Sequence, residues 1–294
     1  MKDNLYKIPD FKRIDPFLMS INSADNHWMY ISSTGCLTAG RQQAKYSLFP
    51  YVTDDLLHQN ARYTGPTTHI LVEQNNKKYL WQPFSDQIES YKKENNLYKN
   101  SLGNKVVFEE TNHSLGLTFL YSWQASSRYG FVKKTKLINH SEVKLNVKLI
   151  DGLRNILPAG LELRIQQEMS NLANAYKVSE CNPDYNYALY YMNALLMDKP
   201  DPGESLFSNM VWSFSEEKFK LSVNQKSINT FLNDQCFTSD LLIKGKEGSF
   251  LNYIEKSLDQ DDEMCWYIVA DVKKSQSDIL EIVSDLKEND TLKD

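Results

Sequence analysis

The stretch Leu115-Gly116-Leu117-Thr118-Phe119-Leu120-Tyr121-Ser122-Trp123 decides the fold class, because each odd-numbered position carries a large apolar side chain. Alternation with a period of two is typical of a β-strand that buries one face. Val143–Leu149 repeats this alternation, with lysines among the outward positions. Polar runs at Thr111–Ser114 and Asn139–Ser141 favour hairpin turns. The segment from about Lys105 to Asp151 is therefore predicted to be an antiparallel meander.

Further strands are predicted on both sides of this meander. They are expected at Trp28–Ile31, His69–Glu73, Lys78–Trp81, Tyr187–Leu196, Ser208–Phe214 and Glu263–Asp271. Many short strands joined by polar turns favour a sandwich or a barrel. We expect a mainly β fold, a large antiparallel β-sandwich, with one or two helices.

Two segments show the helical period of three to four residues instead. One is predicted near 159–178, and its apolar stripe consists of Leu161, Ile165, Met169, Leu172 and Tyr176. The other is predicted at Gln276–Leu286, with Ser275 or Ser277 as its cap. We expect one sandwich domain over 1–274 with an inserted helix, followed by a C-terminal helix and charged tail over 275–294.

Composition narrows the classes of partner. The chain has 294 residues, is 41% hydrophobic and 24% charged, and carries a net charge of −5. This balance, without a cluster of lysine and arginine, argues against binding nucleic acid or an anionic membrane. The N-terminal residues lack the apolar core of a secretory signal, and no run is long enough to span a membrane. We expect a cytoplasmic protein.

The sequence shows no spacing that favours a metal or a cofactor. The cysteines are far apart and the histidines never fall at ligand spacing; the cysteines are Cys36, Cys181, Cys236 and Cys265. The small-residue segment Gly35–Gly40 has neither the dinucleotide-binding glycine pattern nor the lysine of a phosphate-binding loop. We interpret it as a tight connection between strands, followed by Arg41 as a candidate anion contact.

Two segments place aromatic residues around a proline. Leu48–Asp55 ends in two adjacent carboxylates, and Trp81–Phe84 again places aromatic residues on both sides of a proline, after a predicted strand. Rings fixed beside hydrogen-bonding carboxylates suit a sugar, which has an apolar face and a rim of hydroxyls. The candidate ligand contacts are therefore Tyr51, Asp54, Asp55 and Trp81, with Arg41 nearby. Alternatively, the rings cap the core at strand ends, and an aspartate in this predicted loop caps backbone N–H groups.

Other acidic and histidine residues offer weaker candidates. Glu109 and Glu110 are adjacent on a predicted strand, so they should point to opposite faces. Asp261–Glu263 is typical of a solvated turn. His69 or His113 with Glu109 would be the first acid–base pair to consider if the chain were an enzyme on its own.

The order of motifs between Trp28 and Pro158 resembles a known family. The motifs are Ser33–Gly35, Leu37–Arg41, Leu48–Tyr51, Thr53–Asp55, Thr64–Gly65, Trp81–Phe84, Phe108–Asn112 and Leu115–Leu117. This order resembles the N-terminal region of cellobiose phosphorylase and its relatives in glycoside hydrolase family 94. The resemblance implies a galactose-mutarotase-like β-supersandwich, followed in such enzymes by a helical linker and an (α/α) six-fold barrel with the catalytic groups. This sequence ends at Asp294 without the paired helices of that barrel, so no catalytic residue is carried over.

Three functional hypotheses remain open. The first is an N-terminal, carbohydrate-associated domain of a glycoside phosphorylase-like or hydrolase-like protein, non-catalytic alone, whose partners are an oligosaccharide or sugar and a missing C-terminal barrel. The second is a self-contained epimerase-like or lyase-like β-sandwich enzyme. The third is a pure carbohydrate-binding module. A homodimer is also expected from the resemblance.

Overall fold

The computed structural model describes residues 5–74, 77–85, 90–194, 205–234 and 236–288. Its largest sheet has ten strands, and all neighbouring pairs are antiparallel. In spatial order they are β1 (Leu5–Pro9), β7 (Lys93–Asn100), β8 (Lys105–Asn112), β9 (Leu117–Ser126), β10 (Gly130–Asn139), β18 (Glu263–Lys274), β14 (Ser208–Ser215), β13 (Tyr187–Met192), β12 (Lys177–Asn182) and β16 (Leu242–Lys244). The strand nearest the C-terminus, β18, thus lies in the interior of the sheet.

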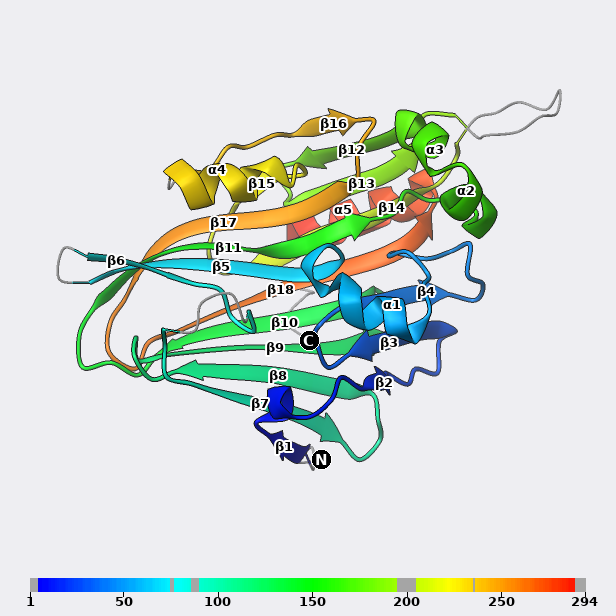
Figure 1. Ribbon diagram of the computed structural model, residues 1–294. Helices are drawn as coiled ribbons and strands as arrows, with labels where there is room; N and C mark the ends of the chain where they lie inside the picture. The colour runs from blue at the N-terminus through cyan, green and yellow to red at the C-terminus, as the bar shows by residue number, and fades with distance from the viewer. Residues whose placement is uncertain (1–4, 75–76, 86–89, 195–204, 235, 289–294) are drawn as a thin grey trace, which may run out of the picture.

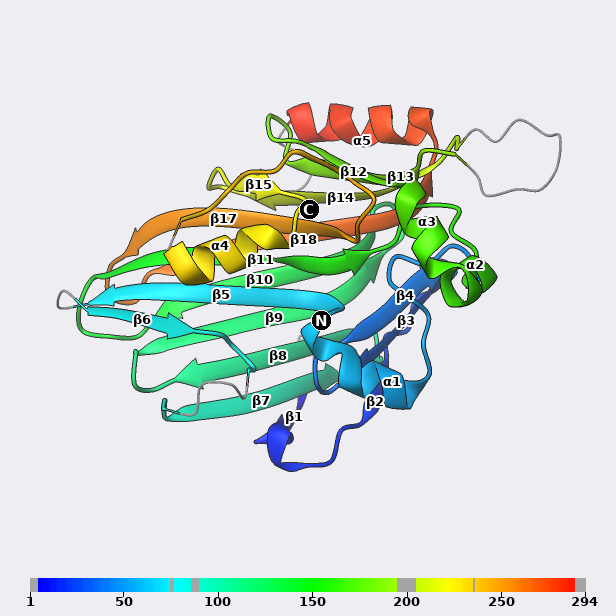
Figure 2. The same ribbon diagram turned by 45° about the horizontal axis from the view of Figure 1, so that its top comes forward.

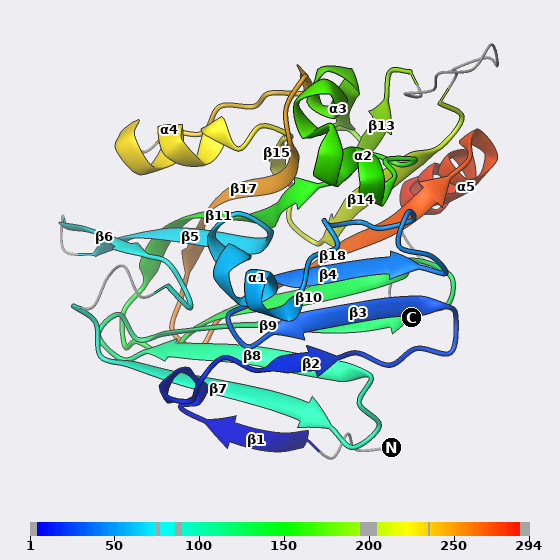
Figure 3. The ribbon, with the colours of Figure 1, turned by 45° about the vertical axis from the view of Figure 1, so that its right-hand side comes forward.

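A second layer packs on one face of this sheet (Figures 1 and 3). It contains a five-stranded sheet, in the order β15 (Lys220–Ser222), β17 (Gly248–Leu258), β11 (Leu145–Ile156), β5 (Gly65–Gln74) and β6 (Lys77–Trp81). Beside it lies a three-stranded sheet of β2 (Leu18–Ser20), β3 (His27–Ser32) and β4 (Leu37–Arg41). The architecture is therefore a two-layer antiparallel sandwich.

The hydrophobic core fills the space between the layers. Inward side chains of β9 and β11 are almost completely enclosed, and they are Leu117, Phe119, Tyr121, Trp123, Leu145, Val147 and Leu149. Each large apolar side chain buried in this way stabilises the fold by about 1.5–3 kcal/mol. The alternating segments Leu115–Trp123 and Val143–Leu149 thus contribute to the core from different layers. The predicted meander is correct for β8, β9 and β10, but β11 crosses to the five-stranded sheet and pairs there with β17 and β5. The predicted mainly β, antiparallel fold class is confirmed.

Two helices cover the outer faces of the sandwich. α4 (Lys226–Asp234) packs on the five-stranded sheet through Ile228 and Phe231. α5 (Gln276–Glu288) lies along the outer face of the ten-stranded sheet, against Trp212 and Val269 (Figure 2). The predicted C-terminal helix is therefore confirmed.

The start of α5 has the reciprocal capping that its sequence suggested. The Ser275 hydroxyl accepts from the Asp278 backbone N–H at 3.3 Å, and the Asp278 carboxylate accepts from the Ser275 backbone N–H at 2.8 Å. Two backbone donors at the helix start are satisfied in this way. The charged residues after Glu288 lie outside the described part of the chain.

The helix predicted near 159–178 is instead two short helices, α2 (Leu163–Glu168) and α3 (Ser170–Tyr176). Met169 separates them with φ −133° and ψ 32°. Met169 is 45% exposed and Leu172 is 50% exposed, so the expected apolar stripe does not face the core along its length. Ala173 is buried in its place.

The remaining helical elements lie near the N-terminal third of the chain. η1 (Phe11–Arg13) is a 3-10 turn after β1, and α1 (Asp54–Gln59) runs directly into a second 3-10 turn, η2 (Asn60–Arg62). Figure 3 shows α1 lying across the junction between β4 and β5. The loop predicted at Asp54 and Asp55 is therefore the first turn of a helix.

Candidate functional site

The segment Leu48–Asp55 forms a corner between the small sheet and α1. Leu48 and Phe49 are completely buried. The Leu48 backbone N–H donates to the Ala39 carbonyl at 2.8 Å, and the Leu157 N–H donates to the Leu48 carbonyl at 2.9 Å. These contacts fix the chain so that Tyr51 turns outward, where 43% of the residue is exposed.

Tyr51 belongs to a cluster with Trp28 and Tyr30, which we call the aromatic surface. Its ring meets the Trp28 ring edge-on at a centroid distance of 5.8 Å, and the Trp28 and Tyr30 centroids are 6.4 Å apart. The alternation of β3 explains the cluster, because His27, Met29 and Ile31 face inward while Trp28 and Tyr30 face outward. The sequence predicted this strand but did not predict that its outer side chains would meet Tyr51.

A glycine allows the Trp28 ring to lie against β4. A Cβ added at Gly40 would lie 2.4 Å from Trp28 Cζ2 and 2.4 Å from the Tyr46 carbonyl oxygen. Within the described part of the chain, no hydrogen bond engages the Trp28 indole N–H or the hydroxyls of Tyr30 and Tyr51. The aromatic surface therefore presents ring faces together with polar groups free to bind a ligand.

Asp54 and Asp55 lie in the exposed first turn of α1, next to this surface. The Thr53 hydroxyl donates to the Asp55 carboxylate, and the Asp55 backbone N–H donates to Asp54 Oδ1 at 3.0 Å. The Thr53 hydrogen bond lowers the pKa of Asp55. A carboxylate kept ionised at a helix start favours the helix, whereas a general acid requires a raised pKa. The geometry thus favours the capping role over proton donation.

A cavity of about 120 Å³ lies on the other side of the Leu48–Asp55 corner. Its lining residues come from several elements and carry no formal charge; they are Cys36, Pro50, Val52, Leu57, Asn60, Tyr63, Thr64 and Asn155. Pro50 and Val52 lie on either side of Tyr51 in the sequence, so one short segment contributes to both the cavity and the aromatic surface.

A β-bulge brings Asn155 into this cavity. The pairing of β11 with β17 shifts between Arg154 and Ile156, and Asn155 adopts φ 56°. The Asn155 amide then donates to the Thr64 hydroxyl at 2.9 Å. Bulges often redirect a side chain next to a binding site. Asn155 was not singled out from the sequence, because an isolated asparagine between apolar residues gives no sign of a bulge.

Arg154 holds the segment that closes the cavity. Its guanidinium donates to the carbonyls of Ala61, Arg62 and Pro66, with the Ala61 contact at 2.8 Å. Burial lowers its pKa to about 10. Because these carbonyls belong to η2 and to the start of β5, Arg154 ties both segments to β11.

Trp81 is not part of the aromatic surface. It is 1% exposed, and its indole N–H donates to Glu110 Oε1 at 2.7 Å. The Phe84 backbone N–H donates to the other Glu110 oxygen at 2.9 Å. Burial raises the pKa of this Glu110 carboxyl. A ring enclosed in this way caps the core and cannot stack on a ligand, which corrects the sequence-based expectation for Trp81.

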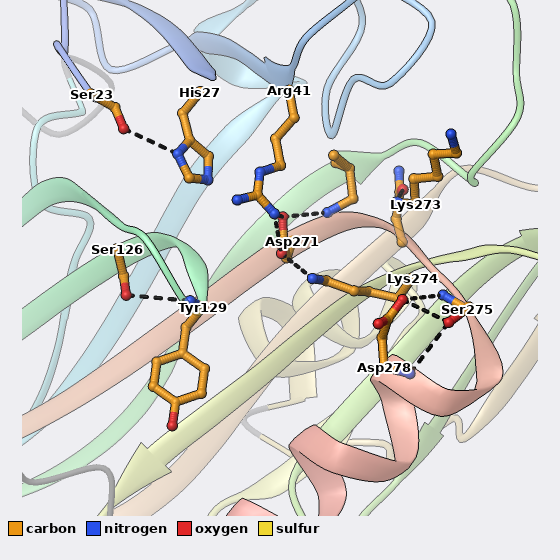
Figure 4. Close-up of polar contacts among 12 residues, drawn as sticks. Ser23, His27, Arg41, Ser126, Tyr129, Asp271, Lys273, Lys274, Ser275 and Asp278 are labelled. Carbon is orange, nitrogen blue, oxygen red and sulfur yellow. Dashed lines mark hydrogen bonds and ion pairs between the residues drawn. The ribbon is translucent and has the colours of Figure 1, made fainter. Parts of the chain in front are cut away.

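Arg41 forms an ion pair with a buried carboxylate of the same chain. Figure 4 shows Arg41 from β4 and Lys274 from β18 pointing at Asp271. One Arg41 nitrogen lies 3.0 Å from Asp271 Oδ2, and Asp271 is fully buried. The expected anion contact of Arg41 is therefore an internal ion pair that ties the small sheet to the ten-stranded sheet.

His27 lies beside this ion pair (Figure 4). Its Nδ1 lies 3.1 Å from the Ser23 hydroxyl, and its Nε2 has no partner among the described residues. Burial, followed by the positive charge of Arg41, lowers the pKa of His27. The imidazole is thus held neutral within the packed end of the sandwich.

The candidate acid–base pairs are not assembled in the described structure. Glu109 accepts from the Tyr98 hydroxyl at 2.8 Å and from the Asn96 amide at 3.0 Å, while His113 lies 3.7 Å from Glu94. His69 is buried, its Nε2 lies 3.1 Å from the Thr67 hydroxyl, and burial lowers its pKa to about 4. Neither histidine is paired with Glu109.

Glu109 and Glu110 do point to opposite faces, as strand alternation predicts. Glu263 of the acidic run at Asp261–Glu263 contacts Lys136 at 2.8 Å, and Asp261 adopts φ 61° in a turn. Within the described residues, no group of three or more histidine, cysteine or acidic residues is placed to hold a metal ion. In the same part of the chain, no helix is long and apolar enough to cross a membrane.

Comparison with known proteins gives structural matches without sequence matches. No protein-family profile and no curated protein matches this sequence. A polysaccharide lyase matches with a TM-score of 0.51 and 10% identity, over 91% of this chain and 34% of the lyase. The chain therefore spans about a third of the length of that enzyme.

Two more distant structures complete the comparison. A galactose mutarotase-like protein from Lactobacillus casei ATCC 334 gives a TM-score of 0.43 at 7% identity, over 87% of this chain and 100% of that protein. A protein designated a kojibiose phosphorylase, from the human microbiome, gives 0.42 at 11% identity, over 93% of this chain and 28% of that protein. At 10% identity, the match to the polysaccharide lyase shows that the two chains share a fold.

Proposed function

We propose that this chain is the carbohydrate-associated β-sandwich domain of a larger carbohydrate-active protein, and that it contacts saccharide through Trp28, Tyr30 and Tyr51. The observation that carries the proposal is the exposed aromatic surface, whose indole N–H and hydroxyls have no protein partner in the described structure. Aromatic faces pack against the C–H face of a sugar, and free donors bind its hydroxyls.

The domain is proposed to be non-catalytic by itself. The hydrogen bond from the Thr53 hydroxyl lowers the pKa of Asp55, and neither His69 nor His113 contacts Glu109. The match to one third of a polysaccharide lyase supports a sandwich that works beside a separate catalytic domain. The motif order between Trp28 and Pro158 favours a phosphorylase-like protein, with a helical barrel as that domain. The expected homodimer stays a prediction that light scattering would check.

Saccharide binding by the purified chain tests the proposal directly. A panel of β-linked disaccharides and longer oligosaccharides would be titrated by calorimetry against the wild type, Tyr51→Ala and Trp28→Ala. Each substitution removes a ring contact of about 0.5–1.5 kcal/mol, so affinity should fall roughly two- to tenfold. Tyr6→Ala is the matched control, because Tyr6 is 66% exposed on β1, outside the aromatic surface.

Two outcomes would contradict the proposal. One is that no saccharide in the panel binds, or that Tyr6→Ala weakens binding as much as Tyr51→Ala does. The other concerns catalysis: consumption of a disaccharide by the chain alone, with or without phosphate, would show that the domain is an enzyme by itself.

A further inference from the structure

The cavity behind Tyr51 has a composition that restricts what can enter it. Two side-chain amides and three hydroxyl or thiol groups line it, from Asn60, Asn155, Tyr63, Thr64 and Cys36. Burial raises the pKa of the Cys36 thiol to about 12, so the thiol stays protonated at neutral pH. Arg154, a half-buried cation whose charge acts on Cys36, directs its donors to backbone carbonyls outside the lining. The cavity is therefore polar and uncharged.

Its size restricts the ligand further. A volume of about 120 Å³ is much more than one water requires, yet it lies below the roughly 300–1,000 Å³ of pockets that enclose a whole small molecule. Only part of a saccharide could therefore enter. Pro50 and Val52 line the cavity and flank Tyr51 in the sequence, so one short segment separates the cavity from the aromatic surface.

We propose that this cavity is a specificity subsite that receives an uncharged, hydroxyl-bearing edge of a sugar, such as its hydroxymethyl group, and excludes the corresponding carboxylate. This inference rests on the proposed function, because the aromatic surface must hold the rest of the saccharide. The Asn155 and Asn60 amides offer donors and acceptors to a hydroxyl. A carboxylate would lose its hydration there without a charged donor to bind it, because the Arg154 donors already bind backbone carbonyls.

Paired ligands and paired variants test the subsite. Methyl glucoside, methyl galactoside and the matching uronates would be titrated against the wild type, Asn155→Gly and Val52→Phe. Glycine tolerates the φ of 56° at position 155, so Asn155→Gly removes the amide without straining the backbone. Asn186→Gly is the matched control, because Asn186 has φ 51° in the turn between β12 and β13. Thermal melting would confirm that each variant is folded.

The expected result is a wild-type preference of at least about tenfold for the neutral sugar over its uronate. Asn155→Gly should weaken neutral-sugar binding roughly two- to tenfold, the worth of one hydrogen bond, while Asn186→Gly leaves it unchanged. Val52→Phe should weaken it by filling the cavity. The neutral sugar should also shift the Asn60 side-chain amide resonance in nuclear magnetic resonance spectra.

The outcomes separate the two proposals. If saccharide binds and Tyr51→Ala weakens it, but Asn155→Gly and Val52→Phe do not, then water alone occupies the cavity and the subsite is overturned while the proposed function stands. Equal affinity for uronate and neutral sugar would overturn the subsite as well. If the wild type binds no saccharide at all, both proposals fail.

Discussion

Lys133 and Asp151 form an ion pair that is completely enclosed between the two layers. The Lys133 ammonium donates to both oxygens of Asp151, at 2.7 and 2.8 Å. The Trp266 indole N–H and the Thr68 hydroxyl each donate to the same carboxylate at 2.7 Å. Burial lowers the pKa of Lys133. The carboxylate on β11 thus receives donors from three other strands, β10 and β18 of the ten-stranded sheet and β5 of the five-stranded sheet.

Removing one member of this pair should be strongly destabilising. Lys133→Met would leave the Asp151 charge buried without its cation, so the free energy of unfolding should fall by about 3–5 kcal/mol in urea titrations. Lys136→Met is the matched control on the same strand, because Lys136 pairs with the half-exposed Glu263 and should change stability by less than about 1 kcal/mol. Equal effects of the two substitutions would refute the role assigned to the buried pair.

His69 should make stability depend on pH below neutrality. Burial lowers its pKa from the ordinary 6.5 to about 4 in the folded chain, so the unfolded chain binds more protons between these two pH values. The stability from neutral His69 is therefore present above pH 6.5 and is lost as the pH falls toward 4.

We expect wild type to lose about 2 kcal/mol more than His69→Gln between about pH 7 and about pH 5. Urea titrations at the two pH values measure this difference, and His27 contributes equally in both proteins. His113→Gln, at an exposed position, should behave like wild type. Parallel pH profiles for wild type and His69→Gln would show that the buried imidazole is not responsible.

Two residues show what the sequence could and could not predict about the exposure of aromatic rings. Tyr51 was found because its proline-centred segment is unusual along the chain, and the structure leaves its ring exposed. Trp81 sits in a similar local pattern but is enclosed, because its ring packs in the core against Phe119 of the other layer and its indole N–H donates to Glu110. Local pattern alone does not determine which aromatic ring is covered by another layer.

Among the elements, α5 offers a direct test of helix packing. Ile282 is 7% exposed against the ten-stranded sheet, whereas Leu280 on the same helix is 62% exposed. Ile282→Ala should lower the free energy of unfolding by about 2–4 kcal/mol through lost burial and the remaining cavity. Leu280→Ala should change it by less than about 0.5 kcal/mol. A similar loss in both variants would contradict the packing of α5 on this face.

Elements were predictable where their side chains follow a clear period, whereas β17 was missed despite its 11 residues. The strands β9 and β11 and the helix α5 carry a clear period over many residues, and all three were predicted. α1 has only six residues and α4 only nine, which gives too few turns for a helical period to stand out. The apolar period at 159–178 was real, but the exposed Met169 interrupts the helix.

At the scale of the whole molecule, β18 holds the ten-stranded sheet together. It pairs with β10 on one side and with β14 on the other. Truncation after Leu258 removes β18 and should leave a chain without cooperative unfolding, because the two parts of the sheet lose their shared strand. Truncation after Lys274 removes only α5 and should leave a folded but less stable chain, as circular dichroism and thermal melting would show.

Deletion of residues 1–9 is the control for this pair of truncations. It removes β1, which lies at the edge of the same sheet, so the remaining strands keep their neighbours. We expect this variant to unfold cooperatively. Loss of folding after this deletion, or normal folding after truncation at Leu258, would contradict the central position of β18.

The sequence by itself determined the fold class, the meander of β8, β9 and β10, and the C-terminal helix, because periodicity and turn chemistry act between neighbours in the chain. Only the tertiary structure decided which rings are exposed. Trp28 and Tyr30 meet Tyr51 because β3 packs beside the corner after β4, and the bulge at Asn155 opens onto a cavity formed by segments more than 100 residues apart. Arg41, which the sequence suggested as an anion contact, instead pairs with Asp271, a residue 230 positions later in the chain. Burial and pairing depend on contacts across the two layers, and such contacts leave no period in the sequence.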